Sequence, residues 1–343
     1  MKRLTVMIFV LTVLFGLSCF IVPEAPAQSA KQILIGGGRT DDSWYPFSQA
    51  LAKFINEKSK WLKAEAVSTA GISGNFDMVK EQPEKYIGIS SFSQIHYRPG
   101  HEYSKKRGAY TGDRFIATAS TMTQCLITYD PKIKRVEDLA GKVVDVGRKG
   151  AANTPDHMAI LEAYGVAKKV KDIVYTGYGG GASKMMDGLV DASFLLFNHI
   201  YPRTFSKGAI IDKLETKAPA YYVGFDRDKL LALMDKEFAV LPVRVPAKAL
   251  DPVRQPADIW AFNDPTFFIA DEKMDPKIVY EVTRVIWETP AEEWAKWHPI
   301  GAHMTPEFKP APPSLKLNPL HAGAKKYYDE KGIKVQDLVE LLK

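Results

Sequence analysis

The sequence has very few cysteines: Cys19 and Cys125 are the two among its 343 residues. Cys19 lies in an apolar N-terminal stretch that we expect to be removed, so a mature chain would keep Cys125 alone and could form no internal disulfide. Cys125 itself lies in an apolar run, which is typical of a buried core residue and not of a reactive thiol. The fold must therefore be held by its hydrophobic core.

Features of several function classes are also missing. The formal net charge is +6, but basic and acidic residues interleave without a long basic run, so we expect no nucleic-acid partner. There is no Gly-x-Ser-x-Gly elbow, no phosphate-binding Gly-Lys-Thr loop and no His-Glu-x-x-His helix. His96, His101 and Glu102 do not have the spacing of a tight metal site, and we expect surface histidines there. The sequence therefore predicts no enzyme, no cofactor and no metal.

The N-terminal stretch has the three parts of a signal peptide. Lys2 and Arg3 precede an uncharged apolar run, Leu4–Val22, and the small-residue segment Pro23–Ala27 follows it. The run is long enough to be a membrane anchor, and Cys19 could carry a lipid, but the Ala-Pro-Ala site favours cleavage after Ala27. We therefore expect export to the periplasm and no transmembrane segment in the mature chain.

Apolar strands alternate with amphipathic helices along most of the chain, which predicts two α/β series with parallel strands. The expected strands are 32–35, 64–68, 86–90, 115–118, 125–129, 142–146, 173–175, 192–196 and 266–270. The expected helices begin at Pro46 and Asn75 or cover 154–164, 182–188, 275–287 and 319–331. A proline-rich stretch from Leu241 to Pro256 can be neither regular helix nor central sheet, and it is predicted to be a connector that wraps over the surface.

Five segments resemble the TAXI receptors of TRAP transporters. Ile35–Pro46 is similar in length and frame to the Gly/Thr-rich loop and Tyr-Tyr-Pro with which those receptors begin. The other four resemble the family's second loop, its entry into the second lobe, an acidic turn before an apolar strand, and its C-terminal helix; they are Thr69–Asn75, Val136–Gly147, Asp187–Phe194 and Pro319–Tyr328. Single elements of this kind occur in many binding proteins, but this order covers nearly the whole mature chain.

The resemblance implies an α/β, two-lobed periplasmic-binding-protein fold of the Venus-flytrap, type II-like kind, with hinge strands between the lobes. We expect a signal peptide over 1–27, lobe I over 28–120, lobe II over 121–264, and a return to lobe I over 265–343. The implied function is that of a periplasmic receptor that captures a small organic acid or amino-acid-like ligand for TRAP-type membrane permease subunits. We expect a monomer, because nothing indicates a self-pairing face.

Ligands of such sheets lie beyond the carboxyl ends of the strands, where helix N-termini favour anions. The candidate ligand contacts in lobe I are Arg39, Thr40, Ser43, Trp44, Tyr45, Ser73, Asn75, Ser91 and Ser93. Those in lobe II are Arg148, Asn153, Thr154, Asn198 and Asn263. Arg39 and Arg148, with Lys149, would pair with an acidic group, and Phe92, Phe197 and Phe262 would suit an apolar portion if they line the cleft. The Ser, Thr and Asn residues at the starts of helices could equally be N-caps of their own helices instead of ligand contacts.

The family pattern is altered at two loops. Asp41 and Asp42 stand where the family usually has glycines, and Ala151–Asn153 stands where Ser-Gly-Thr is common. These changes leave the fold prediction intact but alter the groups that would bind an amino-acid-like ligand. Two further readings stay open: a sensor that presents its closed form to a membrane kinase, and an enzyme on the same fold.

Overall fold

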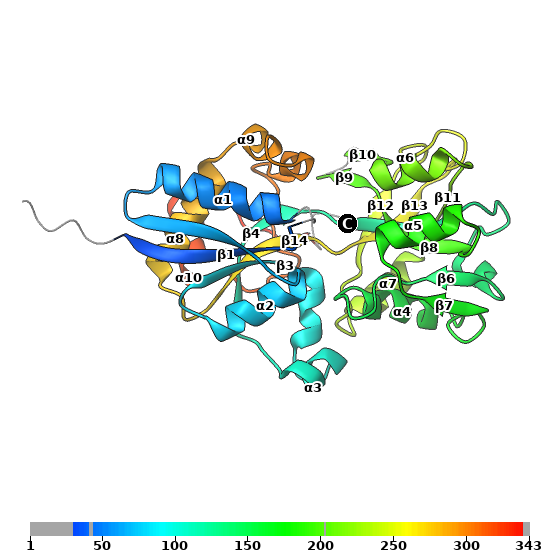
Figure 1. Ribbon diagram of the computed structural model, residues 1–343, viewed down its shortest axis with the longest axis horizontal. Helices are drawn as coiled ribbons and strands as arrows, with labels where there is room; N and C mark the ends of the chain where they lie inside the picture. The colour runs from blue at the N-terminus through cyan, green and yellow to red at the C-terminus, as the bar shows by residue number, and fades with distance from the viewer. Residues whose placement is uncertain (1–29, 41–43, 202–203, 339–343) are drawn as a thin grey trace, which may run out of the picture.

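The computed structural model describes residues 30–40, 44–201 and 204–338, and it contains two α/β lobes side by side (Figure 1). Each lobe is built around its own sheet. A five-stranded sheet has the order β2-β1-β3-β14-β4, and the larger sheet runs β12-β13-β5-β8-β6-β7, with β11 paired to β5. The predicted fold class, a two-lobed periplasmic-binding-protein architecture, is confirmed. The expected signal peptide lies outside the described residues.

Lobe I packs helices on both faces of its sheet, around a core to which Phe47, Phe268 and Trp294 contribute. Strands β1, β2 and β3 pair in parallel, whereas β14 returns antiparallel between β3 and β4. Its elements are β1 (Lys31–Gly38), α1 (Trp44–Lys58), β2 (Leu62–Ser68), α2 (Ile72–Glu81), β3 (Tyr86–Ser91), η1 (Phe92–Tyr97), α3 (Glu102–Arg107), β4 (Asp113–Ser120), β14 (Thr266–Asp271), α8 (Pro276–Glu288), α9 (Ala291–Ala295), η3 (Pro299–His303) and α10 (Ala322–Glu330).

Lobe II has a parallel part, β8-β6-β7, extended by antiparallel strands, and Cys125 is buried in its core as predicted. Its elements are β5 (Thr123–Thr128), η2 (Val136–Leu139), β6 (Val143–Asp145), α4 (Thr154–Ala163), β7 (Asp172–Val174), α5 (Tyr178–Met186), β8 (Ala192–Leu196), β9 (Asn198–Ile200), β10 (Thr204–Ser206), α6 (Ala209–Glu215), β11 (Tyr221–Val223), α7 (Arg227–Met234), β12 (Leu241–Val245) and β13 (Ile259–Asn263).

The chain crosses between the two sheets twice (Figure 1). It leaves lobe I after β4 and enters β5 at Thr123; it returns after β13 and enters β14 at Thr266. The two crossings are tied together, because the backbone N–H of Met122 donates to Oδ1 of Asn263 over 2.8 Å. Such paired crossing strands are positions where a lobe movement can be absorbed by a few backbone angles.

Three of the predicted elements are corrected by the structure. Strand β1 continues through the expected glycine loop to Gly38, because Gly36 and Gly38 still pair with β2. Helix α2 begins at Ile72, three residues before the expected Asn75. The stretch 241–245, predicted to be part of a surface connector, is the edge strand β12; Pro242 is tolerated there because an edge strand has one side without a partner strand.

Across the described residues, no helix combines the length and the apolar character that crossing a membrane requires.

Candidate functional site

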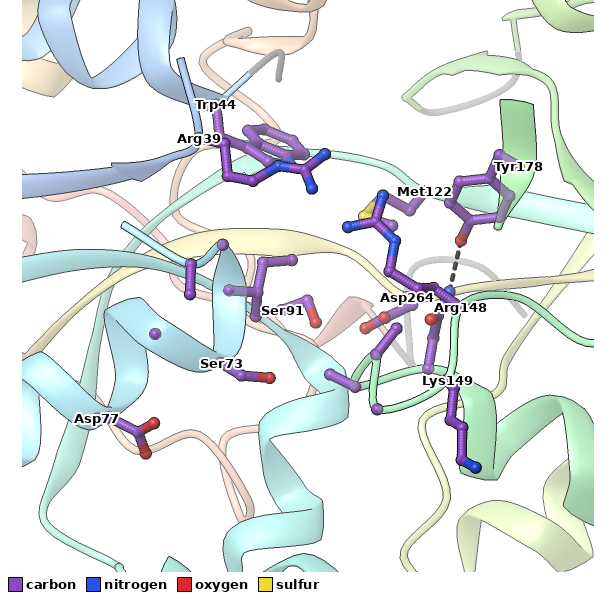
Figure 2. A pocket seen from close by; sticks show the side chains of 18 of the residues that line it. Arg39, Trp44, Ser73, Asp77, Ser91, Met122, Arg148, Lys149, Tyr178 and Asp264 are labelled. Carbon is purple, nitrogen blue, oxygen red and sulfur yellow. Dashed lines mark hydrogen bonds between the residues drawn. The ribbon is translucent and has the colours of Figure 1, made fainter. Parts of the chain in front are cut away.

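A cavity of about 340 Å³ lies between the lobes, where the loops after the central strands of both sheets meet. Arg39, Trp44 and the 70–74 loop line it from lobe I, and the 148–153 loop with Tyr178 lines it from lobe II (Figure 2). Met122 and Asp264, from the two crossings, complete the wall. The volume is at the small end of the range for ligand sites, so it suits a small molecule.

Two arginines enter this cavity from opposite lobes. Arg39 follows β1, Arg148 follows β6, and Figure 2 shows their guanidinium groups directed into the cleft toward one another. Within the described part of the chain, no carboxylate forms an ion pair with Arg148. Lys149 also lines the cavity, but its ammonium group points away from these guanidiniums (Figure 2). The paired positive charges make this the most anion-attracting part of the cavity.

Two helix N-termini also face the cavity. The first turn of α2 follows Gly71, which has no side chain, and α4 follows Asn153, whose side chain accepts no hydrogen bond from its own helix. In α4 the first-turn N–H groups are already used, because Thr154 donates to the backbone oxygen of Ala151 and Asp156 donates to that of Asn153. The N–H groups of a first helical turn have no intrahelical partner, and the helix dipole adds a partial positive charge there. The N-terminus of α2 therefore adds to the positive potential that the two arginines give this part of the cavity.

The lobe II loop is fixed by two hydrogen bonds from its own end. Asn153 donates its Nδ2 to the hydroxyl of Tyr178 over 2.5 Å (Figure 2), and Thr154 donates its hydroxyl to the backbone oxygen of Arg148 over 2.7 Å. The first bond holds Asn153 against the cavity wall, and the second bends the loop so that the Arg148 side chain leaves toward the cleft.

The floor of the cavity carries a buried carboxyl group. Asp264 is 1% exposed, and it accepts the backbone N–H of Ser93 over 2.9 Å and also the Ser93 hydroxyl. Figure 2 shows Ser91 and Asp264 pointing toward one another. Burial, and then the negative charge of Asp156, raise the pKa of Asp264 to about 7.

A buried network beneath the floor joins the lobes. Asp156, at the start of α4, accepts from Nε2 of His96 over 2.9 Å and from the backbone N–H of Ala239 over 2.8 Å. Burial alone would lower the pKa of His96, but the charge of Asp156 and the hydrogen bond to it raise the pKa overall. Since His96 belongs to lobe I and Asp156 to lobe II, this pair is a contact between the lobes.

The structure brings six of the predicted contacts to the cavity. They are Arg39, Trp44, Ser73, Ser91, Arg148 and Asn153. Ser43, Asp41 and Asp42 lie outside the described residues. We keep the six as candidate ligand contacts.

The other predicted contacts have different positions. Thr40 and Tyr45 lie beside the cavity without lining it, and Asn198 is exposed on β9, where its Nδ2 donates to Ser206 over 3.2 Å. Ser93 and Thr154 use their hydroxyls on Asp264 and on the Arg148 backbone. These five are therefore removed from the candidate set.

Two asparagines and three phenylalanines are structural. Asn75 is buried, donates to the backbone oxygen of Ile89 over 2.8 Å and accepts from Thr69 over 2.7 Å. Asn263 holds the crossing through Met122. None of the three phenylalanines considered for an apolar portion of the ligand is among the described residues that line the cleft, because each is packed in a core; they are Phe92, Phe197 and Phe262.

His96 and His101 were predicted to lie on the surface, and this prediction is wrong. His96 is 3% exposed and pairs with Asp156, while the partly buried His101 contacts Glu237 over 2.8 Å. Each partner lies more than fifty residues away in the chain, so no local spacing could have indicated it. The described residues include no group of three His, Cys, Asp or Glu side chains placed to hold a metal ion.

Sequence reasoning missed several lining residues. Asp264, Tyr178, Met122 and the ion pair of Asp77 with Arg107 all line the cavity. A weak signal existed for Asp264, because a carboxylate directly follows a strand at a chain crossing. Tyr178 is the first residue of α5, a helix that was expected to begin only at residue 182.

The chain matches a model of the NMT1-like family over residues 35–332.

Three solved structures are similar to the chain at low identity. The periplasmic aliphatic sulphonate-binding protein SsuA from Escherichia coli is 13% identical, with 92% of this chain and 98% of that chain covered and a TM-score of 0.48. A TctC solute-binding protein from Polaromonas is 13% identical, covering 81% and 89%, with a TM-score of 0.46. A putative L-cystine ABC transporter protein from Listeria monocytogenes is 14% identical, covering 80% and 97%, with a TM-score of 0.44. Such low similarity does not identify a ligand.

Proposed function

This chain belongs to the NMT1-like family, and we propose that it is a solute-binding receptor that holds a small organic anion between its lobes. The observation that carries the proposal is the pair of guanidinium groups, Arg39 from lobe I and Arg148 from lobe II, that enter one cavity from opposite sides. An anion between them would contact both lobes at once. The N-terminus of α2, whose first turn lines the cavity, supports the same charge preference.

The same contacts explain how binding would be signalled. An anion in the closed cleft can form charge-assisted interactions with both guanidinium groups at once, whereas in an open cleft it reaches the guanidinium group of one lobe. The ligand therefore has a higher affinity for the closed arrangement, and only such a difference in affinity can shift the population of lobe positions. The two crossings are where the backbone would turn.

The finer proposal concerns the partner and the compartment. The resemblance of five segments to TAXI receptors supports delivery of the ligand to TRAP-type membrane permease subunits, after export directed by residues 1–27. The receptor would act as a monomer, because a one-to-one complex with the permease requires only the two lobe surfaces around the cleft.

Binding without catalysis is part of the proposal. Ser93 is the hydroxyl closest to a buried carboxylate and histidine, but it donates to Asp264 and does not line the cavity. Nucleophilic catalysis needs a hydroxyl that faces the substrate and donates to a base. The cavity-lining Ser73 and Ser91 are better suited to orienting a polar ligand.

A thermal-shift screen of residues 28–343 against carboxylates, sulfonates, keto acids and amino acids tests the receptor function, together with mass spectrometry of ligand retained through purification. We expect one class of anion to raise the melting temperature in a saturable way, because a ligand that binds only the folded state stabilises it by mass action. Turnover of a compound without any stabilising ligand would contradict the proposal.

A matched pair of variants identifies the site in the same screen. Arg148→Gln should weaken binding of the selected anion by about tenfold to a hundredfold, the usual loss for one charge-assisted contact. Arg135→Gln is the control, because Arg135 is an exposed lobe II arginine outside the cavity whose ion pair is with Asp138. Equal affinity in both variants would place the anion elsewhere.

A further inference from the structure

Asp264 is the one acidic side chain on the cavity floor, and its surroundings provide hydrogen-bond donors but no charge partner. It lies between β13 and β14, where the chain crosses from lobe II to lobe I, and it is 1% exposed. Ser93 donates both its N–H and its hydroxyl to the carboxyl group. In the described part of the chain, no Lys, Arg or His forms an ion pair with Asp264.

The nearest basic side chain under the floor already has a partner. His96 pairs with Asp156 over 2.9 Å, so the charge of that histidine is matched by a different carboxylate. The titratable groups that face Asp264 are Asp156 from α4, His96 from η1 and Tyr178 from α5. Among these, Asp156 adds negative charge. A buried carboxylate beside a second one is unfavourable unless a positive charge is supplied.

The other acidic residue of the cavity, Asp77, is in a different situation. Its carboxylate contacts Nη1 of Arg107 over 2.6 Å, and both side chains lie on the lobe I wall. Once this pair is set aside, the cavity has a positive end at Arg39 and Arg148 and a separate negative group at Asp264. The lining between them includes Trp44, Met122 and Tyr178, which would cover an apolar or short aliphatic segment.

We propose that Asp264, with the Ser91 hydroxyl beside it, binds an ammonium group of the ligand while Arg39 and Arg148 bind its anionic end. The ligand class is therefore a small zwitterion, an amino carboxylate or an amino sulfonate. This inference rests on the proposed receptor function and makes it more specific. An ammonium group supplies the missing positive charge and three hydrogen-bond donors. Protonation of Asp264 would instead supply a single donor and no positive charge.

Ligands with an ammonium group and anions without one should respond to pH in opposite directions. The pKa of Asp264 is raised by burial and by Asp156 to about 7, so the carboxyl group loses its proton across neutral pH. A ligand with an ammonium group needs the ionised form, so its affinity rises as the pH increases through about 7. An anion without an amine is repelled by the ionised form, so its affinity falls over the same range.

Two matched probe pairs test the assignment by isothermal titration calorimetry on the unmodified protein: 3-aminopropanoate with propanoate, and taurine with ethanesulfonate. In each pair the probes differ only by the amine, and the two pairs distinguish a carboxylate from a sulfonate at the arginine end. We expect the amine member of at least one pair to bind about tenfold tighter or more at about pH 8.5, with a smaller advantage at about pH 6.

The variant Asp264→Asn should remove most of that advantage, because the amine member loses its carboxylate partner. The amine-free member should regain at about pH 8.5 the affinity that it has at about pH 6, because the repelling charge is gone. The control is Asp145→Asn, another buried carboxylate with a raised pKa, which bonds Thr176 and Ser193 and does not line the cavity. The pH dependence of the unmodified protein gives the answer independently if either variant fails to fold.

Three results would overturn the inference. One is tighter binding of the amine-free probes, another is an amine preference that Asp264→Asn preserves, and the third is selection by the wider screen of an anion without an amine. In all three the receptor function survives, because an anion still binds and Arg148→Gln still weakens it. If no anion of any class binds, the proposed function itself fails and this inference fails with it.

Discussion

The two walls of the cleft are fixed in different ways. On the lobe I side the wall is held by close packing: a Cβ atom at Gly36 would lie 2.0 Å from the Tyr86 hydroxyl and 2.3 Å from Oδ1 of Asn75. On the lobe II side the loop that carries Arg148 is exposed, and hydrogen bonds through Asn153 and Thr154 hold it. Lobe I therefore provides a rigid shape, and lobe II provides a charged loop that can adjust to a ligand.

Changing a glycine on each side should expose this difference most strongly. Gly36→Ala should lower the free energy of unfolding by about 2–3 kcal/mol, because the added methyl group must displace buried Tyr86 or Asn75. Gly179→Ala, in helix α5 of lobe II, has no atom within 4 Å of the new Cβ and should be neutral or slightly stabilising. Urea unfolding of both variants measures the contrast, and equal effects would show that lobe I is not the more tightly packed wall.

Acid should weaken the lobe II wall through a buried histidine. His157 lies under the Arg148 loop, with Nδ1 2.9 Å from the backbone oxygen of Val146, and burial lowers its pKa to about 4. The unfolded chain takes up this proton near its ordinary pKa of about 6.5, so the free energy of unfolding should fall as the pH drops from about 6.5 to 4, by about 2 kcal/mol.

Lobe I has a matching group in His303, whose pKa burial and His199 lower to about 4, so it gives a control. Chemical unfolding at several pH values should show that the free energy of unfolding falls less at acid pH in His157→Gln and in His303→Gln than in the unmodified protein. If intrinsic fluorescence and ligand affinity are followed together, only His157→Gln should change how affinity responds to acid. If only His303→Gln changed that response, the adjustable wall would be in lobe I.

Removing one hydrogen bond from the lobe II loop should loosen it without unfolding the protein. Asn153→Ala deletes the bond to the Tyr178 hydroxyl, and the affinity for the bound anion should fall about threefold to tenfold, the effect of about 1 kcal/mol. Asn198→Ala is the control, since this exposed amide bonds Ser206 and does not line the cavity. Calorimetric titration of both variants decides the point: a loss common to both would mean that the loop is not what positions the anion.

The smallest effect is expected at Lys149. Its ammonium group points away from the two guanidiniums, so Lys149→Gln should change the affinity by less than about twofold, the range of an exposed charge at moderate distance. The comparison with Arg148→Gln is direct, because the two residues are neighbours on one loop. A large loss at Lys149 would show that the loop turns over when the ligand binds.

Local pattern was enough to predict most of the architecture. The alternation of apolar strands and helices located β1 to β8 and β14, and β8 matches its predicted range, 192–196, whereas β9 to β13 were not predicted. The predicted ends of elements were wrong where tertiary contacts extend a strand beyond its local pattern. Gly36 and Gly38 have low strand propensity, but pairing with β2 keeps them in β1. Pro242 was taken to exclude a central strand, which holds, but the edge position of β12 permits it.

Local pattern was also enough for the part of the site that follows strands directly. Arg39, Ser73, Ser91, Arg148 and Asn153 line the cavity because each follows or opens an element at the same edge of its sheet. It failed at side chains whose hydrogen bonds turn them inward. Asn75 and Ser93 have the residue type and position of ligand contacts, but their polar atoms are used within the protein.

The sequence by itself determined that this chain forms two α/β lobes and which loops end at the cleft, because strand and helix periodicity and turn chemistry are local properties. Only the tertiary structure decided that Arg39 and Arg148 share one cavity, that His96 pairs with Asp156, and that Asp264 is buried on the floor without a counter-ion. These facts depend on how segments more than fifty residues apart come together. Charge interactions and burial are set by that three-dimensional proximity, which no local pattern of residues encodes.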